Sequence, residues 1–180
     1  MTLAPQVIVR PARLADARDI AALHHVSVHR LAAGFYPREV LERWSPQPSL
    51  GRAERLYREA QAEGAMTLVA ELHGQIVGFG IVHPTRDEIS ACYVAPEQAR
   101  RGVGHTLLTA MELTLAGAGR HVIRVRAALN ARSFYTALGY QVTGRGEHVF
   151  DDGTRMVVTY LEKDLSPLGL IGEQQRRRHH

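Results

Sequence analysis

The sequence predicts an α/β fold, in which helices cover the faces of a mixed β-sheet. Two observations carry this prediction. Apolar residues recur with helical spacing up to about residue 63, and with strand-like spacing in most segments after it. Strands and helices then alternate, with glycine or proline at most of the junctions. The length of 180 residues and the apolar share of 45% fit one domain with a substantial core.

The N-terminal third is predicted to hold one strand and three helices. The apolar run 7–9 begins a strand that the nearby proline ends, because proline lacks the N–H that a strand ladder needs. Asp16 is suited to the N-cap of a helix that runs to about Ala33, since its carboxylate can accept hydrogen bonds from the free N–H groups of the first turn. Two shorter helices follow, between breaks rich in proline or glycine, at 38–44 and 52–63.

From residue 67 onward strands dominate. Two apolar runs around His73-Gly74 predict a tight hairpin. A strongly periodic helix begins at Val103 and is closed by Gly117 and Gly119. A further short helix is expected at 131–138. The predicted strands of this part lie at 67–72, 75–82, 88–94, 121–127, 140–150 and 154–161.

The positive charge of the chain is concentrated at its C-terminal end. Three arginines (176–178) against Glu173 supply +2 of the net charge of +4, so the body of the chain carries only +2. A nucleic-acid-binding protein is expected to present a dense basic face, which this composition does not favour. We therefore expect one domain over 1–165 and a flexible basic tail over 166–180, which also suits the remnant of a purification tag.

The composition argues against disulfides, metal sites and membrane segments. Cys92 is the single cysteine, so no internal disulfide can form. His25 and His29 have the helical i, i+4 spacing of some zinc ligands, but no third ligand is evident, so no metal is expected. No apolar run approaches the ~18 residues of a membrane span, and the N-terminus lacks the apolar core of a signal peptide. The sequence thus favours a cytoplasmic protein with no membrane partner.

The segment 94–105 leaves a predicted strand, turns, and opens the longest amphipathic helix. The first turn of a helix has N–H groups without partners and a partial positive charge, so it attracts phosphate. Gly102 and Gly104 remove side chains where an anion must approach the backbone, and Arg100 and Arg101 add positive charge nearby. This pattern indicates a phosphate-binding turn.

Two better-known nucleotide sites fit this segment poorly. The P-loop pattern GxxxxGK[ST] is absent, and a lone Gly-x-Gly without a third glycine and a following acidic residue is a weak dinucleotide signal. The plain alternative is a strand-to-helix turn whose glycines serve only packing.

With these residues in view, the sequence resembles the GNAT superfamily of acyl-CoA N-acyltransferases. Its phosphate motif, [QR]-x-x-G-x-[GA], follows a strand that ends in a V-x-P-like tripeptide. Here 94–96 reads Val-Ala-Pro and 102–104 reads Gly-Val-Gly, while Ala99 departs from the usual Gln or Arg. A second segment, 130–140, resembles the family's N…A-x-x-F-Y-x-x-x-G-[FY] motif at the expected distance. The order of the predicted elements follows the family from about residue 7 to 165.

The resemblance implies a GNAT-like sheet, mostly antiparallel, with helices on both faces and a splay between its fourth and fifth strands. It also implies acetyl-CoA as the acyl-donor cosubstrate, bound in that splay. Backbone groups of Cys92 and Val94 would pair with the pantetheine amides, and Asn130 would contact the pantetheine arm. The pyrophosphate would be held at the turn, by Arg100, Arg101, Gly102, Val103, Gly104, His105 and Thr106.

The implied reaction needs two proton transfers, since an amine attacks only when deprotonated and the departing thiolate benefits from a proton donor. In the family, the residue that matches Tyr135 faces the thioester sulfur, so Tyr135 is the expected acid; core packing of the ring is its alternative role. Glu88 is the expected base, with ordered water or a plain solvated strand end as alternatives. His83 could act in a water relay.

The acceptor is expected to be a primary amine, on a small molecule or a peptide. The broken segment between the first strand and the hairpin typically forms one wall of the acceptor pocket in the family. It contains Tyr36 and Trp44, which we expect to line that wall unless both only pack the helix against the sheet. Two other functions stay open: a non-catalytic acyl-CoA-binding module of the same fold, and a transferase for a longer acyl donor. Members of the family are often homodimers.

Overall fold

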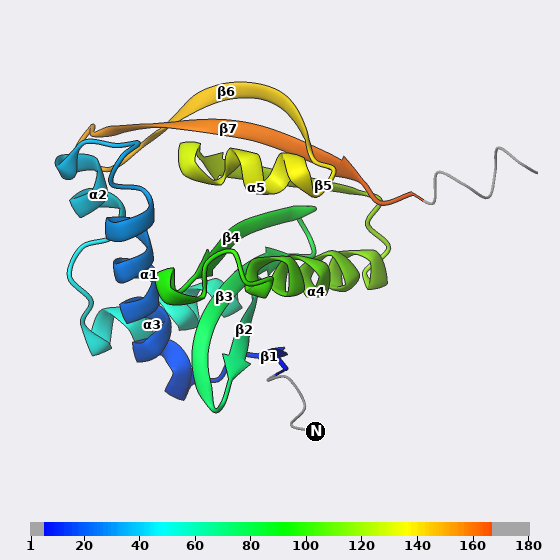
Figure 1. Ribbon diagram of the computed structural model, residues 1–180, viewed down its shortest axis with the longest axis horizontal. Coiled ribbons are helices and arrows are strands. Elements are labelled where there is room, and N and C mark those ends of the chain that lie inside the picture. The colour runs from blue at the N-terminus through cyan, green and yellow to red at the C-terminus, as the bar shows by residue number, and fades with distance from the viewer. Residues whose placement is uncertain (1–5, 167–180) are drawn as a thin grey trace, which may run out of the picture.

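The computed structural model describes residues 6–166 and contains one seven-stranded sheet with helices on both faces (Figure 1). The strands are β1 (Ile8–Pro11), β2 (Met66–Leu72), β3 (Gln75–His83), β4 (Glu88–Val94), β5 (Val122–Ala128), β6 (Gln141–Val149) and β7 (Arg155–Asp164). The α-helices are α1 (Ala17–Leu31), α2 (Arg38–Trp44), α3 (Leu50–Ala62), α4 (Val103–Gly117) and α5 (Arg132–Ala137). Short 3-10 turns are η1 (Leu14–Asp16), η2 (Pro96–Gln98) and η3 (Leu129–Ala131). Each predicted strand and helix is present, with small shifts at the ends. All but the first residue of the predicted tail lies outside the described residues.

The order of the strands confirms the predicted mostly antiparallel sheet. The order is β1-β2-β3-β4-β5-β7-β6, and only β4 and β5 run parallel. These two strands pair only at their first residues, Glu88 with Arg124 and Ile89 with Val125. Beyond this short joint they diverge, and Figure 1 shows the β5–β7–β6 part of the sheet apart from β4. The predicted splay between the fourth and fifth strands is therefore confirmed.

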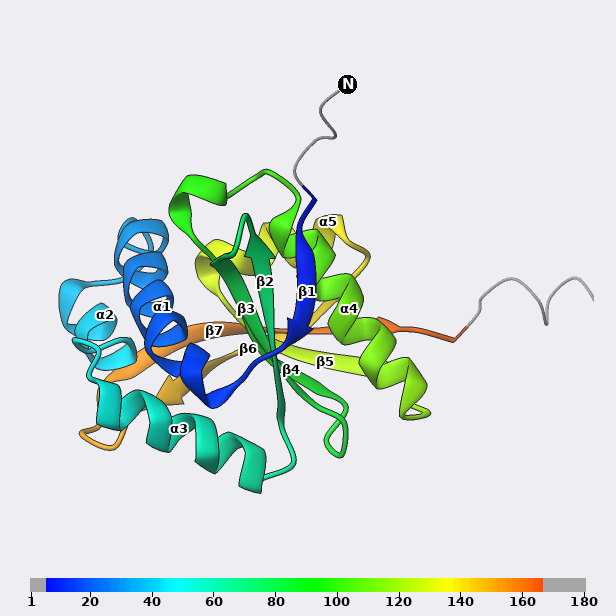
Figure 2. The same cartoon turned by 90° about the horizontal axis from the view of Figure 1, so that it is seen from below.

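The sheet has helices on both faces, and Figure 2 shows α1 and α3 on one side and α4 on the other. Two glycines of β3 allow α4 to lie close to the strands. A Cβ atom on Gly78 would lie 2.8 Å from Leu107 Cδ1, and one on Gly80 would lie 2.5 Å from Met111 Sδ. Leu107 and Met111 are fully buried. The apolar stripe of α4 thus forms the centre of the core, as its helical spacing predicts.

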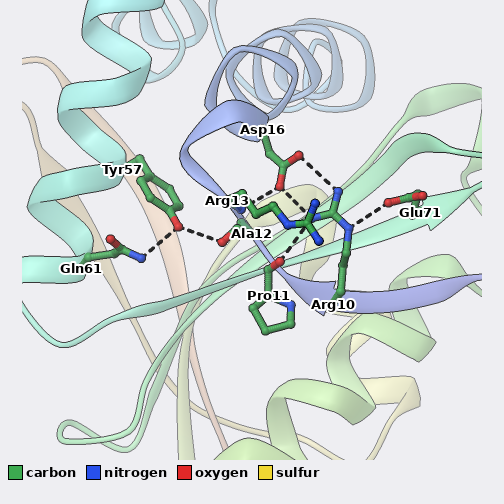
Figure 3. Close-up of polar contacts among 8 residues, drawn as sticks. All are labelled: Arg10, Pro11, Ala12, Arg13, Asp16, Tyr57, Gln61 and Glu71. Atoms are coloured by element: carbon green, nitrogen blue, oxygen red, sulfur yellow. Dashed lines mark hydrogen bonds and ion pairs between the residues drawn. The ribbon is translucent and has the colours of Figure 1, made fainter.

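The start of α1 differs in detail from the prediction. Asp16 occupies the N-cap position, but its carboxylate makes no capping bond to the helix. Instead it accepts hydrogen bonds from Arg10 Nη1 and from the Arg13 N–H, each at 2.7 Å (Figure 3). Arg10 also donates to Glu71 on β2 at 2.8 Å. The hydrogen bond from Arg10 lowers the pKa of Asp16, so the carboxylate stays charged and ties η1 to the sheet.

A second contact in Figure 3 fixes α3 against the segment that follows β1. The Tyr57 hydroxyl donates to the Ala12 carbonyl at 2.8 Å, and Gln61 Nε2 donates to the Tyr57 hydroxyl at 2.9 Å. Within residues 6–166, no helix is both long enough and apolar enough to cross a membrane.

Candidate functional site

A cavity of about 840 Å³ opens where β4 and β5 diverge. Its lining comes in part from β4, the first turn of α4 and α5, whose ribbons are drawn in Figure 1. We call it the splay cavity. The predicted site residues that border it are Trp44, Cys92, Val94, Arg100, Gly102, Gly104, His105, Asn130 and Tyr135.

The first turn of α4 presents unused N–H groups to the splay cavity. Gly102 is the N-cap with φ +85°, a left-handed conformation that glycine adopts without strain. The first helical hydrogen bond runs from the Thr106 N–H to the Gly102 carbonyl at 3.0 Å, so the N–H groups of residues 103–105 have no partner inside the helix. No side chain of the described residues caps them. The 15-residue helix adds its dipole, so this turn is suited to an anion.

Gly104 has a packing role in addition to its place in this turn. A Cβ atom there would lie 3.2 Å from Phe134 Cε2 on α5 and 3.5 Å from Val94 Cγ2 on β4. The absence of a side chain therefore lets α5 approach the start of α4. The packing role and the anion-binding role of this glycine are compatible, because the N–H groups face the cavity while Phe134 packs on the Cα atom.

The edge of β4 that faces the splay carries unpaired backbone groups. On the other edge, the Ala95 N–H donates to the Val77 carbonyl at 2.8 Å, and alternate residues back along β4 point the same way, toward β3. The residues between them, Cys92 and Val94, therefore direct N–H and C=O groups toward β5, which does not pair with them. Such groups need a partner from outside the chain, because buried backbone polar groups are almost always hydrogen-bonded.

The thiol of Cys92 is not a reactive group in this structure. Burial raises its pKa to about 12, so it stays protonated at neutral pH. Its sulfur lies 4.0 Å from the Gly104 carbonyl oxygen. Cys92 is thus a small filler between β4 and α4.

Asn130 supplies an unpaired acceptor on the opposite wall. Its side-chain oxygen is buried, and no hydrogen-bond partner is found for it among residues 6–166. The residue borders the splay cavity just after β5, in η3. A ligand with an amide N–H would satisfy this oxygen, which fits the pantetheine arm of coenzyme A.

Tyr135 also borders the splay cavity. The side chain is 4% exposed, and its ring packs edge-on against Phe134 and Tyr140 at centroid distances of 5.1 and 5.3 Å. Burial raises the pKa of the phenol well above its usual value, so the group is a neutral O–H donor. Within the described part of the chain the hydroxyl has no hydrogen-bond partner.

Three predicted residues of the turn do not border the cavity. Val103 is a core residue with 1% exposure. The Thr106 hydroxyl donates to the Gly102 carbonyl at 3.1 Å, which reinforces the helix start. Arg101 is exposed to solvent beside the turn.

Glu88 and Tyr36 also lie away from the splay cavity. Glu88 pairs with Arg124 at the joint of β4 and β5, where the splay is closed. Tyr36 is 7% exposed, and its hydroxyl donates to the Val157 carbonyl and accepts from the Leu129 N–H, both at 2.7 Å. These two bonds make Tyr36 a link between the α1–α2 region and the β5–β7 part of the sheet.

A second cavity, of about 440 Å³, lies between α1, α3 and strands β2–β4. We call it the α3 cavity. Its wall in common with the splay cavity consists of Trp44, Ser90, Ala91 and Tyr93. The two cavities are therefore adjacent along these four residues. Trp44, predicted for the acceptor pocket, lies at this junction.

Ser90, a residue of the common wall, lies at an irregularity of β4 that was not predicted from the sequence. Ile81 pairs with Ala91 but Val82 pairs with Ile89, so Ser90 is an extra, bulged residue of β4. Bulges leave no periodic signal in a short apolar strand, so this one could not be located from sequence. The α1 residues of the splay cavity, such as Ser27 and Leu31, were missed too, because helical spacing does not say which end of a face meets a ligand.

Two histidines border the α3 cavity. His83 at the end of β3 is 8% exposed; its Nε2 lies 2.9 Å from Ser90 Oγ, and no partner within residues 6–166 is found for its Nδ1. His24 on α1 packs edge-on against Tyr93 at 4.6 Å, and Ser45 Oγ lies 2.9 Å from its Nδ1. Burial lowers the pKa of His24 to about 4.

His25 and His29 lie on the outer side of α1. Each has a ring nitrogen 2.9 Å from the Ser45 carbonyl oxygen, so both hold the turn after α2. Across residues 6–166, no group of three or more His, Cys, Asp or Glu side chains is arranged to hold a metal ion.

Comparison with known proteins gives the family. Residues 33–162 match the family model of the acetyltransferase (GNAT) domain. A curated protein of Mycobacterium tuberculosis, named as a probable N-acetyltransferase, is 28% identical over 142 residues, which cover 76% of this chain and 81% of that protein.

Solved structures agree with this match. A GCN5-related N-acetyltransferase from Rhodopseudomonas palustris superposes with a TM-score of 0.79 at 31% identity, covering 92% of this chain and 99% of the other. The PaiA N-acetyltransferase of Thermoplasma acidophilum, solved in complex with coenzyme A, has a TM-score of 0.70 at 21% identity and covers 88% and 99%. The latter shows the fold alone. The chain therefore belongs to the GNAT superfamily and is an acetyltransferase.

Proposed function

We propose that the protein binds acetyl-CoA in the splay cavity and transfers the acetyl group to a primary amine that occupies the α3 cavity. The observation that carries the proposal is the set of unpaired groups around one cavity. The first turn of α4, the open edge of β4 and the side-chain oxygen of Asn130 border it without partners in the described chain, and Tyr135 borders it too. Each matches one part of an acyl-CoA.

The cofactor contacts follow from these groups. The N–H groups of residues 103–105 would hold the pyrophosphate, with Arg100 and Arg101 contributing positive charge. Backbone groups of Cys92 and Val94 would pair with the pantetheine amides as an added strand would, and Asn130 would accept from the same arm. When bound, acetyl-CoA supplies a thioester that can react with an amine directly.

Two groups of the chain serve the transfer itself. The Tyr135 hydroxyl would protonate the departing sulfur, because burial keeps the phenol neutral. An unpaired N–H on the open edge of β4, such as that of Cys92, would stabilise negative charge on the carbonyl oxygen, as a fixed donor in a water-poor site. Glu88 stays a candidate base, and its place at the closed joint of β4 and β5 means that it would act through water.

A thiol-release assay with acetyl-CoA and a panel of amines tests this function. Release that depends on the added amine supports a transferase. Stabilisation of the fold by coenzyme A, with no release for any amine, would instead support a non-catalytic binding module. Faster release from a longer acyl-CoA than from acetyl-CoA would support a different donor.

A further inference from the structure

We propose that His83 is the group that takes the proton from the attacking amine. This inference rests on the function proposed above. His83 is more than nine-tenths buried, borders the α3 cavity, and leaves Nδ1 without a partner in residues 6–166. Buried polar atoms of native proteins nearly always have a hydrogen-bond partner. A bound ligand in the α3 cavity would supply the missing one.

The position of His83 relative to the splay supports this role. Its Nε2 is hydrogen-bonded to Ser90 Oγ at 2.9 Å, and Ser90 borders both cavities. Ser90 is also the bulged residue, directly after the last residue of β4 that pairs with β5. The imidazole is therefore attached to the point where the splay opens and where the two cavities meet.

The hydrogen bond to Ser90 also orients the imidazole. When Nε2–H donates to Ser90 Oγ, the lone pair of Nδ1 is free to accept an N–H from the ligand. His83 Nδ1 first takes one proton from the ammonium and releases it to solvent. The neutral nitrogen then forms a bond to the thioester carbonyl carbon, and the carbon–sulfur bond breaks. The surplus proton of the nitrogen moves to His83 Nδ1, and the sulfur receives a proton from Tyr135. His83 then returns its proton to solvent, from which Tyr135 is reprotonated.

The walls of the α3 cavity indicate which amines it accepts. They are largely apolar and aromatic, with Trp44, Leu56, Phe79, Ile81 and Tyr93 among them. The two acidic residues at the α3 side, Glu59 and Glu63, are paired with Arg55 and Arg86. A polycationic acceptor would thus find no free acidic wall. We infer that the acceptor carries an apolar or aromatic group next to its primary amine.

Kinetics of His83→Gln test the assignment. Glutamine can still donate to Ser90 but cannot take the proton, so kcat/KM for an apolar amine should fall by about 10²–10⁴ near pH 7. The loss should shrink as the pH approaches that of amine deprotonation in solution. The charged or titratable groups near His83 come from each element that borders the α3 cavity or adjoins its strand: His24, Arg52, Tyr57, Glu59, Glu63, Arg86, Glu88 and Tyr93. Stabilisation of the fold by coenzyme A should be unchanged.

Matched variants make the result decisive. His121→Gln, at an exposed position before β5, should keep wild-type kinetics. Wild-type rates in H83Q together with a large loss in Glu88→Gln would assign the proton to Glu88 and overturn the inference. If H83Q no longer binds coenzyme A, H83A with added imidazole replaces it: recovery of the rate supports the role, and no recovery with intact coenzyme A binding refutes it. Absence of transfer by the wild type itself would refute the proposed function instead.

Discussion

The hydroxyl of Tyr135 lies in buried surroundings that keep it protonated. Its ring is held by Phe134 and Tyr140, while the residue borders the splay cavity. The Tyr140 hydroxyl, by contrast, donates a hydrogen bond to Glu112 Oε1 at 3.0 Å. Neighbouring tyrosines of one motif therefore differ in their surroundings, and on the proposed function the hydroxyl of Tyr135 is the one that serves the transfer.

Tyr135→Phe is expected to lower kcat by about 10²–10⁴, because the ring and its packing stay while the proton donor is lost. Coenzyme A should stabilise the variant as much as the wild type. Steady-state kinetics and thermal unfolding with and without coenzyme A measure the two effects. A variant with normal turnover would reduce Tyr135 to a packing residue.

His24 gives the fold a dependence on pH. Burial, and after it the neighbouring His25 and His29, lower its pKa from 6.5 to about 4. Between these pH values the unfolded chain binds a proton that the folded chain does not, so stability falls as the pH drops. The slope is at most about 1.4 kcal/mol per pH unit. His24→Phe keeps the contacts with Trp44 and Tyr93 but cannot titrate, so its stability should vary less between pH 7 and 5.

Urea unfolding at several pH values measures this slope. The lost bond to Ser45 should lower the stability of the variant at every pH, which separates that effect from the titration. His121→Gln serves as the control, since an exposed histidine should leave the slope as it is. Equal slopes in wild type and His24→Phe would show that other groups cause the acid sensitivity.

At the scale of elements, the site depends on three elements that pack together: β4, α4 and α5. Gly104 lies where all three meet, with Val94 and Phe134 around its Cα atom. The same glycine is therefore required both for an open anion site and for packing. A single substitution there changes two things at once, and two variants are needed to separate them.

Gly104→Glu should abolish stabilisation by coenzyme A, because it places a carboxylate beside two phosphates. With ligand at 100 times its Kd, the wild type should gain about 2.7 kcal/mol. Gly104→Ala introduces the 3.2 Å contact with Phe134 without the charge, so it should lower stability yet keep part of the coenzyme A effect. Thermal unfolding over a ligand series measures both. Full stabilisation of the glutamate variant would move the pyrophosphate elsewhere.

The elements were predictable where their signals are local. Local signals predicted the start of α4 at Gly102, its apolar stripe and the turn at His73-Gly74. The family motifs are local in the same sense, because each lies within one short segment. The joint of β4 and β5 follows from the family resemblance and not from periodicity. The bulge at Ser90 and its bond to His83 depend on strand register, which a short apolar run does not reveal.

Side chains from the α1–α2 region were the hardest to predict. Tyr36 and Trp44 have the same aromatic character in the sequence, yet one is held by two backbone bonds and the other borders both cavities. The difference arises from contacts with residues far away in the sequence. One example is the hydrogen bond from the Leu129 N–H to the Tyr36 hydroxyl, which joins residues 93 positions apart. Composition and spacing carry no information about such partners.

At the scale of the whole molecule, the two cavities lie on the two sides of one wall. Trp44 is part of that wall, and its ring lies edge-on to Tyr36 at 5.8 Å. Trp44→Leu keeps an apolar side chain but removes the indole ring from the wall. The KM for the amine should rise several-fold while the KM for acetyl-CoA changes little. A lower melting temperature with both KM values unchanged would show that Trp44 only packs α2.

The short joint of β4 and β5 has a consequence for the protein as a whole. Within residues 6–166, only two residue pairs join the ladder of the β1–β4 half of the sheet to that of the β5–β7–β6 half. On the proposed function, the pantetheine arm lies along the open edge and completes the ladder that the chain leaves unfinished. The bound cosubstrate would then bridge the two halves of the sheet and hold them at the distance that the acceptor requires. Because each turnover consumes it, this bridge would form and be lost with every reaction cycle.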